Sequence, residues 1–149
     1  MKSMRIRDLE FGDIPTLVRW LQEFHNDFEF PGKRPINNET ASEFFYSFVH
    51  GQNSEIAIIA EQDGKPIATF GAYVLFHPWS GVKLVYKAFW YSSKPGAGLE
   101  LLRYMRDISK ADGAEKFIVS SMTPQVSRLL EREGFLPTET NYVMDFKGI

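Results

Sequence analysis

Two hydrophobic periods alternate along the chain, and their order predicts its architecture. Apolar side chains recur every three or four residues in stretches that begin near residues 14, 38, 98 and 124, which predicts four helices with one buried face each. Alternating or short continuous apolar runs predict strands over residues 4–9, 55–61, 67–77, 82–91, 115–122 and 135–146. The predicted element order is therefore β-α-α-β-β-β-α-β-α-β.

Local signals mark where several of these elements begin and end. Asp63-Gly64 favours a tight hairpin, because both positions of a primed turn need a positive φ. Asp13 and Thr123 are predicted to cap helices, each followed by a proline in the first turn, and Gly113 is predicted to end a helix. The middle strands should form an antiparallel meander, and the later strand-helix-strand unit should be parallel and right-handed. The expected fold class is α/β, with a mixed, mostly antiparallel sheet flanked by helices.

Size and charge narrow the class of protein. The 149 residues make one ordinary domain, spanning 1–149, and 15% of them are aromatic, enough to fill a core. A net charge of −2 disfavours nucleic acid as a partner. The absence of cysteine excludes a disulfide framework and a cysteine nucleophile, and no histidine or carboxylate grouping has metal-ligand spacing, so we expect no metal. No apolar run is long enough to span a membrane and the N-terminus lacks a signal-peptide core, so the expected location is the cytoplasm.

The segment between the strand over 82–91 and the following helix carries the clearest chemical signal. It reads Ser93-Lys94-Pro95-Gly96-Ala97-Gly98-Leu99, and paired leucines follow at 101 and 102. The first turn of a helix has N–H groups without internal partners, and glycines let an anion approach them. Lys94 adds a positive charge. On the residues alone, a plain strand-to-helix turn that needs glycine remains open, and neither a G-x-x-x-x-G-K-[ST] nor a G-x-G-x-x-G loop is present.

The element order and this segment resemble the Gcn5-related N-acetyltransferase (GNAT) superfamily. In that family a loop reading R/Q-x-x-G-x-G/A binds the pyrophosphate of acetyl-CoA, and residues 93–98 match it at both glycines but carry Ser93 at the leading position. SRLLEREGF at residues 127–135 resembles the family's penultimate helix, and the sequence FWY at 89–91 resembles short members encoded by bacteriophages. The resemblance implies acetyl-CoA as co-substrate, bound by these residues: Phe89, Trp90, Tyr91, Lys94, Pro95, Gly96, Ala97, Gly98 and Leu99.

The resemblance also implies an acceptor pocket and a proton-transfer pair. The pocket would lie on the side of the two N-terminal helices and include Phe28, Phe30, Lys33 and Arg34. The glutamate that many members carry on the fourth strand is replaced by Lys87, and the tyrosine of the penultimate helix by Leu130. The remaining catalytic candidates are Tyr142, Ser121 and Lys87 itself.

Three functions stay open at this point. The first is an acetyl-CoA-dependent N-acetyltransferase that transfers the acetyl group directly to an amine of a small molecule or protein. The second is a catalytically silent GNAT-like interaction protein, phage-encoded and acting on a host protein or in the virion, for which Lys87 and Leu130 argue. The third is a module that binds CoA as a structural or sensing ligand. A homodimer or a host-protein partner, and host cytoplasm as the location of a phage protein, belong to the same set of expectations.

Overall fold

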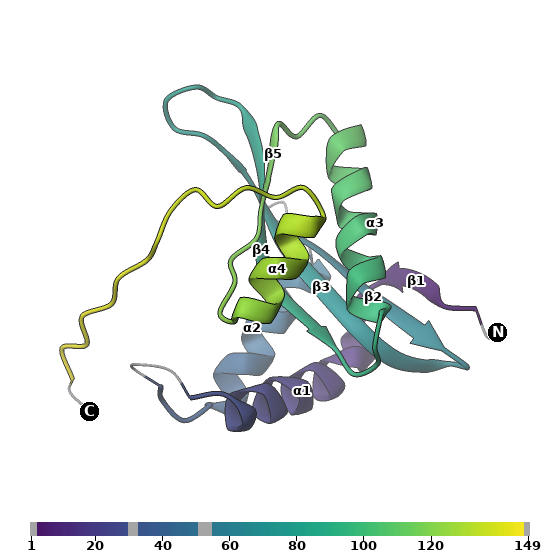
Figure 1. The fold of residues 1–149 in the computed structure, drawn as a ribbon. Helices are drawn as coiled ribbons and strands as arrows, with labels where there is room; N and C mark the ends of the chain where they lie inside the picture. Colours follow the sequence, from purple (N-terminus) through teal and green to yellow (C-terminus); the bar gives the residue numbers. More distant parts are fainter. Residues whose placement is uncertain (1–2, 30–32, 51–54, 148–149) are drawn as a thin grey trace.

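A five-stranded sheet with helices on both faces forms the body of the protein (Figure 1). The computed structural model describes residues 3–29, 33–50 and 55–147. In chain order, the elements are β1 (Arg5–Asp8), the 3-10 turn η1 (Phe11–Asp13), α1 (Ile14–Asp27), α2 (Asn38–His50), β2 (Glu55–Gln62), β3 (Lys65–Phe76), β4 (Lys83–Ser92), α3 (Ala97–Ala111), β5 (Lys116–Ile118) and α4 (Pro124–Arg132). The strands lie in sequence order, antiparallel from β1 to β4, and β5 joins β4 in parallel.

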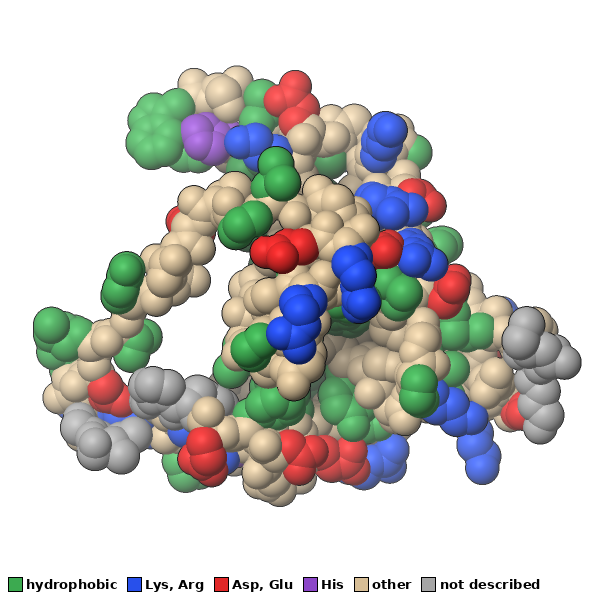
Figure 2. All heavy atoms as spheres, viewed as in Figure 1, with side chains coloured by type: hydrophobic (Ala, Val, Ile, Leu, Met, Phe, Trp, Pro, Cys, Tyr) green, Lys and Arg blue, Asp and Glu red, His purple; other side chains and the backbone are tan. Residues whose placement is uncertain are grey.

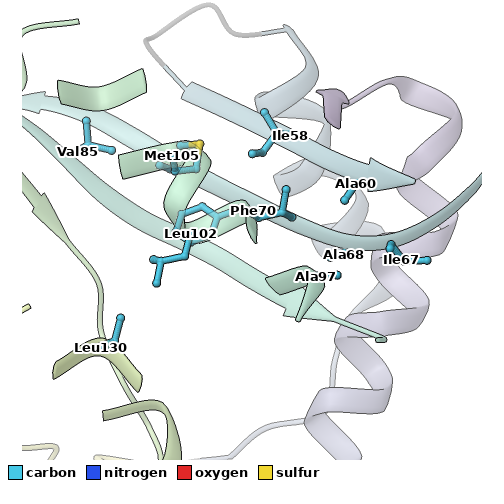
Figure 3. Close-up of a cluster of buried hydrophobic side chains, with 12 residues drawn as sticks. Ile58, Ala60, Ile67, Ala68, Phe70, Val85, Ala97, Leu102, Met105 and Leu130 are labelled. Carbon is cyan, nitrogen blue, oxygen red and sulfur yellow. The ribbon is translucent and has the colours of Figure 1, made fainter. Parts of the chain in front are cut away.

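Two hydrophobic clusters, one on each face of the sheet, hold the layers together. α3 and α4 pack on one face through a cluster that includes Phe70, Leu102, Met105 and Leu130 (Figure 3). α1 and α2 pack on the other face, where Trp20 of α1, Phe45 and Phe48 of α2 and Ile59 of β2 are buried. The helical stripes read from the sequence are therefore the faces that the helices bury.

The predicted local signals are largely confirmed. Asp63 and Gly64 both have positive φ angles, 55° and 75°, and join β2 to β3 in a two-residue turn. The side chain of Thr123 accepts a hydrogen bond from the N–H of Val126 at 3.2 Å and so caps α4. Asp13 does precede α1, but its carboxylate does not cap that helix.

The carboxylate of Asp13 instead ties the N-terminal strand to the helices. Arg7 donates two hydrogen bonds to it, at 2.8 and 2.9 Å, and a third to Glu61 on β2 at 3.0 Å. Burial alone would raise the pKa of Asp13, but the hydrogen bonds from Arg7 and from the N–H of Glu10 hold it below its usual range. The pair therefore fixes β1, β2 and the start of α1 to one another.

A bulge in β4 determines which way its side chains face. Gly71 of β3 lies opposite Phe89, but the next residue, Ala72, lies opposite Lys87, so Ala88 is an extra residue in β4. The ring of Phe89 lies directly over Gly71, where a Cβ would come within 2.2 Å of it. The bulge thus places both Ala88 and Phe89 on the face that α1 and α2 cover.

The predicted last strand over residues 135–146 is wrong. Phe135 packs against the core, but no strand follows it in the described chain, and the segment over residues 136–146 runs away from α4 as an extended arm (Figure 1). Arg34 holds the far end of this C-terminal arm by two hydrogen bonds of 2.8 Å to Asp145. The residue types favour a strand, but a strand also needs an edge to pair with, and the arm pairs with none in the described chain.

Gly71→Ala should lower the free energy of unfolding by about 1–3 kcal/mol, because the added methyl group would overlap the ring of Phe89. Urea denaturation of the purified chain measures this change. Gly12→Ala is the matched control, since a Cβ there meets no atom within 4 Å. An equal effect of the two substitutions would contradict the close approach of β3 and β4.

Candidate functional site

The central feature of the site is the point where β4 and β5 separate. The two strands pair at three register positions only, from Leu84 opposite Lys116 to Tyr86 opposite Ile118. β4 then continues to Ser92, whereas β5 ends, and the following residues 119–122 lead to α4. One backbone edge of β4, from residue 87 onward, therefore faces a gap instead of a neighbouring strand.

Lys87 crosses this gap. Its Nζ donates a hydrogen bond to the carbonyl oxygen of Ser120 at 3.2 Å, from β4 to the segment after β5. The side chain is partly buried, and burial lowers the pKa of Lys87 below its ordinary value of 10.5. The structure thus brings together two regions that the sequence singled out, around residue 87 and around residues 120–121.

The three aromatic residues expected along the cofactor turn their side chains into the two cores. Phe89 lies edge-on against Phe45 and Phe48, with ring centroids 5.1 and 5.0 Å away. Tyr91 stacks on Trp20 at 5.0 Å. Trp90 points to the opposite face of the sheet, where it joins the cluster beneath α3. What this part of β4 offers to the gap is therefore its backbone.

The loop between β4 and α3 is built around Ser92. The hydroxyl of Ser92 donates to the carbonyl of Lys94 at 2.6 Å and accepts the N–H of Gly98 at 3.1 Å. Trp90 donates its indole N–H to the carbonyl of Gly98 at 3.0 Å. A Cβ on Gly98 would lie 3.0 Å from the Cβ of Ser92, so the glycine lets the helix approach the strand. The sequence predicts a cofactor loop from Ser92 to Leu99, but the two hydrogen bonds of the Ser92 hydroxyl could not be read from its place at the end of the strand.

The first turn of α3 has the features of an anion site. Gly96 precedes the helix with a φ of 84°, and its position has open space around it. Within the described residues, the N–H groups of Gly96 and Leu99 have no hydrogen-bond acceptor, while those of Ala97 and Gly98 do. The helix dipole adds positive potential at the same end. This arrangement suits a phosphate group.

The charge beside this turn comes from an exposed lysine. Lys94 donates to the side chain of Gln62 at 3.0 Å, across the loop from the β2–β3 hairpin. Pro95 is also exposed and lacks an N–H, whereas Ala97 is buried at the base of the turn. The donors at this turn therefore suit a pyrophosphate: the N–H groups of Gly96 and Leu99 and the ammonium group of Lys94, with no carboxylate among residues 92–99.

The other catalytic candidates differ in how close they lie to the gap. Ser121 is near it in sequence and space, but its hydroxyl is bonded to the carbonyl of Thr123 at 3.0 Å and to the hydroxyl of Ser127 at 2.8 Å. Leu130 is buried in the core and offers no proton. Tyr142 lies on the C-terminal arm and is 91% exposed, so the structure does not bring it to Lys87.

The residues expected to receive the acceptor lie on the outer side of α1. Lys33 and Arg34 line an open groove of about 620 Å³, together with residues that the sequence did not suggest: Gln22, His25 and Asn26 in the second half of α1, and Glu29 just after it. Lys33 is bonded to Glu29 at 3.1 Å, and Arg34 to the arm. Phe28 packs against Phe24 instead of lining the groove, and Phe30 lies outside the described residues.

Metal ligands and membrane-spanning helices can be assessed in the part of the chain that the structure describes. No group of three or more His, Cys, Asp or Glu side chains there could hold a metal ion. None of the described helices is both long enough and apolar enough to cross a membrane.

Comparison with known proteins gives matches in structure alone. No protein-family model and no curated protein matches the sequence. A predicted acetyltransferase from Clostridium acetobutylicum, solved with acetyl-CoA, superposes with a TM-score of 0.74 over 97% of both chains at 17% identity. Glucosamine-6-phosphate N-acetyltransferase from Arabidopsis thaliana gives 0.74 over 97% of this chain and 99% of its own, at 16% identity. Ribosomal-protein-alanine N-acetyltransferase from Brucella melitensis gives 0.73 over 97% and 99%, at 17% identity.

These likenesses establish the fold. The chain has the GNAT-like acyl-CoA N-acyltransferase fold, with a mixed, mostly antiparallel sheet and helices on both of its faces. The expected fold class is therefore confirmed, apart from its last strand. Within that fold, residues 87–99 of this chain run along the gap between β4 and β5 and form the turn that begins α3.

The buried position of Lys87 predicts a specific pH dependence of stability. Because its pKa is lowered on folding, the unfolded chain binds more protons between that lowered value and 10.5, and stability should rise with pH across this window. Lys87→Met removes the titrating group while keeping a long side chain. The unfolding free energy of the original chain minus that of the variant should increase from neutral pH towards 10.5. A difference that stays constant over this range would contradict the burial of the ammonium group.

Proposed function

We propose that this protein is an acetyl-CoA-dependent N-acetyltransferase that transfers the acetyl group directly to an amine of a small molecule or protein. One observation carries the proposal: the open edge of β4 leads straight to a helix N-terminus with two free N–H groups and a lysine. An open strand edge can pair with an extended, amide-bearing chain, and the helix N-terminus can bind the phosphates at its end. Acetyl-CoA has both parts.

Each segment of the site has its own part in this proposal. Acetyl-CoA supplies an acyl group activated as a thioester. The backbone of β4 over residues 89–91 binds the pantetheine amides, and the N–H groups of Gly96 and Leu99 bind the pyrophosphate. Lys94 is exposed and can turn from Gln62 to a phosphate. The partly buried side chains of Phe89, Trp90 and Tyr91 pack against the two clusters and so anchor this stretch of β4.

The transfer step needs a neutral amine and a proton for the leaving sulfur. The amine nitrogen attacks the thioester carbon, the new C–N bond forms, the C–S bond breaks, and the proton that the amine loses ends on the sulfur. Without cysteine in the chain, no acyl-cysteine forms and transfer is direct. Lys87 lies at the gap. Its lowered pKa raises the fraction of molecules in which its side chain is a neutral amine, which can accept a proton. Positioning of the two substrates supplies the larger share of the rate, on the order of 7–11 kcal/mol at best.

The acceptor is an amine of a small molecule or of a protein, and the names of the structural neighbours include both classes. Their names include a sugar-phosphate and a ribosomal-protein acetyltransferase. The groove lined by Lys33 and Arg34 is wide and open, which suits a protein segment as well as a small molecule.

A catalytically silent relative is the second candidate function. It is favoured by Leu130, which is buried in the core and offers no proton, and by Tyr142, which is 91% exposed on the C-terminal arm. Binding of CoA without turnover would identify such a protein, or a sensor of CoA.

Acetyl-CoA at a hundred times its dissociation constant should stabilise the fold by about 2.7 kcal/mol, which raises the melting temperature by roughly 5–10 °C for a chain of this size. Differential scanning fluorimetry with acetyl-CoA and CoA measures the shift. Release of free thiol in the presence of amine acceptors then measures the transfer. The absence of a shift at millimolar acetyl-CoA would contradict the proposal.

Two matched substitutions locate the binding site. Lys94→Gln should weaken acetyl-CoA binding about tenfold, the equivalent of one hydrogen bond to a charged group. Lys110→Gln, near the end of α3 remote from the loop, changes the net charge equally and should leave the affinity unchanged. Equal affinities of the two variants would place the phosphates elsewhere.

A further inference from the structure

Lys87 places a reactive group inside the proposed site. When its side chain is neutral, it is a primary amine and therefore a nucleophile of the same kind as the acceptors of the proposed reaction. In Figure 2, many lysine and arginine side chains on the visible face lie at the surface over α3 and α4. Lys87 is instead half-buried on β4, next to the last position at which β4 pairs with β5. Its place in the fold, and not its chemical type, thus separates it from the exposed lysines.

The surroundings of Lys87 favour the neutral form of its amine. Within the described chain, its Nζ donates to one acceptor, the carbonyl oxygen of Ser120 at 3.2 Å, and forms no ion pair with a carboxylate. Burial lowers the pKa of Lys87, and no neighbouring charge opposes this effect. The bond to Ser120 therefore holds the amine in the gap without fixing its positive charge, as a carboxylate partner would.

Under the proposed function, the reactive end of acetyl-CoA comes to this amine. The pyrophosphate would lie on the N–H groups of Gly96 and Leu99, at the far end of the open edge of β4. From there the pantetheine chain would follow the strand from residue 92 back to residue 87, a distance of about 17 Å at the usual rise of a strand. An extended pantetheine chain can follow a stretch of this length. The thioester would then lie at the closed end of the gap, beside the Nζ of Lys87.

We propose that the protein acetylates its own Lys87 when acetyl-CoA is bound and no other amine is present. This inference rests on the proposed function, because it uses the same site and the same co-substrate. The lone pair of Nζ attacks the thioester carbon, the C–N bond forms and the C–S bond breaks. The proton that Nζ loses passes to the sulfur, so the products are free CoA and an Nε-acetyl-lysine at position 87. The step needs no oxidant, metal or further reactant.

Acetylation of Lys87 would switch the site off. The product is an amide, so its nitrogen can neither accept a proton nor attack a second thioester. The enlarged side chain would also occupy the part of the gap next to Ser120, where the acyl group has to lie. Each chain would therefore take up one acetyl group and stop. A good acceptor amine would protect Lys87, because it takes the acetyl group first.

Mass spectrometry of the full chain after incubation with acetyl-CoA tests the proposal on the original protein. One acetyl group should be added per chain, and trypsin should no longer cut after Lys87. Lys87 should react about tenfold faster or more than the exposed Lys65 and Lys110, because its amine is held beside the thioester. An excess of CoA, which fills the site without an acyl group, should slow the reaction at Lys87 and leave the two surface lysines unaffected. Equal rates at the three lysines, or a rate at Lys87 that CoA does not change, would overturn the proposal.

A matched pair of variants tests the same point. Lys87→Arg removes the reactive amine while keeping a long cationic side chain, and should gain acetyl groups only at the slow rate of the surface lysines. Lys110→Arg, at the end of α3, makes the same chemical change elsewhere and should still be acetylated on Lys87. Fast addition of a single acetyl group to the Lys87→Arg chain would contradict the assignment.

The thermal shift with acetyl-CoA separates this inference from the proposed function. If acetyl-CoA stabilises the original chain and Lys87 stays unmodified, the self-acetylation is wrong and the proposed function stands. If acetyl-CoA gives no shift, the proposed function is wrong, and the inference that rests on it falls with it.

Discussion

The brevity of the pairing between β4 and β5 is the constraint on which the rest of the site depends. Three register positions join the strands at Leu84 to Tyr86, and beyond them β4 keeps its course while the chain after β5 turns towards α4. Because of this divergence, a continuous stretch of backbone remains unpaired beside a well-packed core. The hydrogen bond from Lys87 to the carbonyl of Ser120 spans the opening. The same divergence leaves the outer edge of β5 short and open.

Packing on the two faces of the sheet is what leaves the backbone of β4 available. The bulge at Ala88 turns Phe89 over Gly71 and into the aromatic cluster of α2, and Tyr91 onto Trp20. Trp90 goes to the other face and donates to the carbonyl of Gly98, which sets the position of the first turn of α3. The aromatic residues of β4 thus pack into the two clusters, and the unpaired donors at the start of α3 belong to the main chain.

The sequence predicted what depends on local chemistry. Positive φ angles at Asp63 and Gly64, the cap at Thr123 and the burial of Leu101, Leu102 and Met105 in α3 follow from residue type and spacing, and all are present. The glycines before α3 were recognised for the same reason. The bulge in β4, the hydrogen bonds of Ser92 and the bond between Arg34 and Asp145 were not foreseen, because each depends on residues that only the tertiary fold brings together. The prediction of the last strand is wrong for a related reason. The residue types over 135–146 favour an extended, paired backbone, but whether a partner edge lies within reach depends on the tertiary fold.

A crystal structure of the full chain with CoA tests the central claim most directly. The account predicts the pantetheine chain between β4 residues 87–91 and residues 119–122, and the pyrophosphate on the N–H groups of Gly96 and Leu99. It also predicts that the Nζ of Lys87 has left the carbonyl of Ser120 to admit the ligand. CoA bound in the groove along α1, or bound anywhere with the bond between Lys87 and Ser120 intact and the gap closed, would contradict the account.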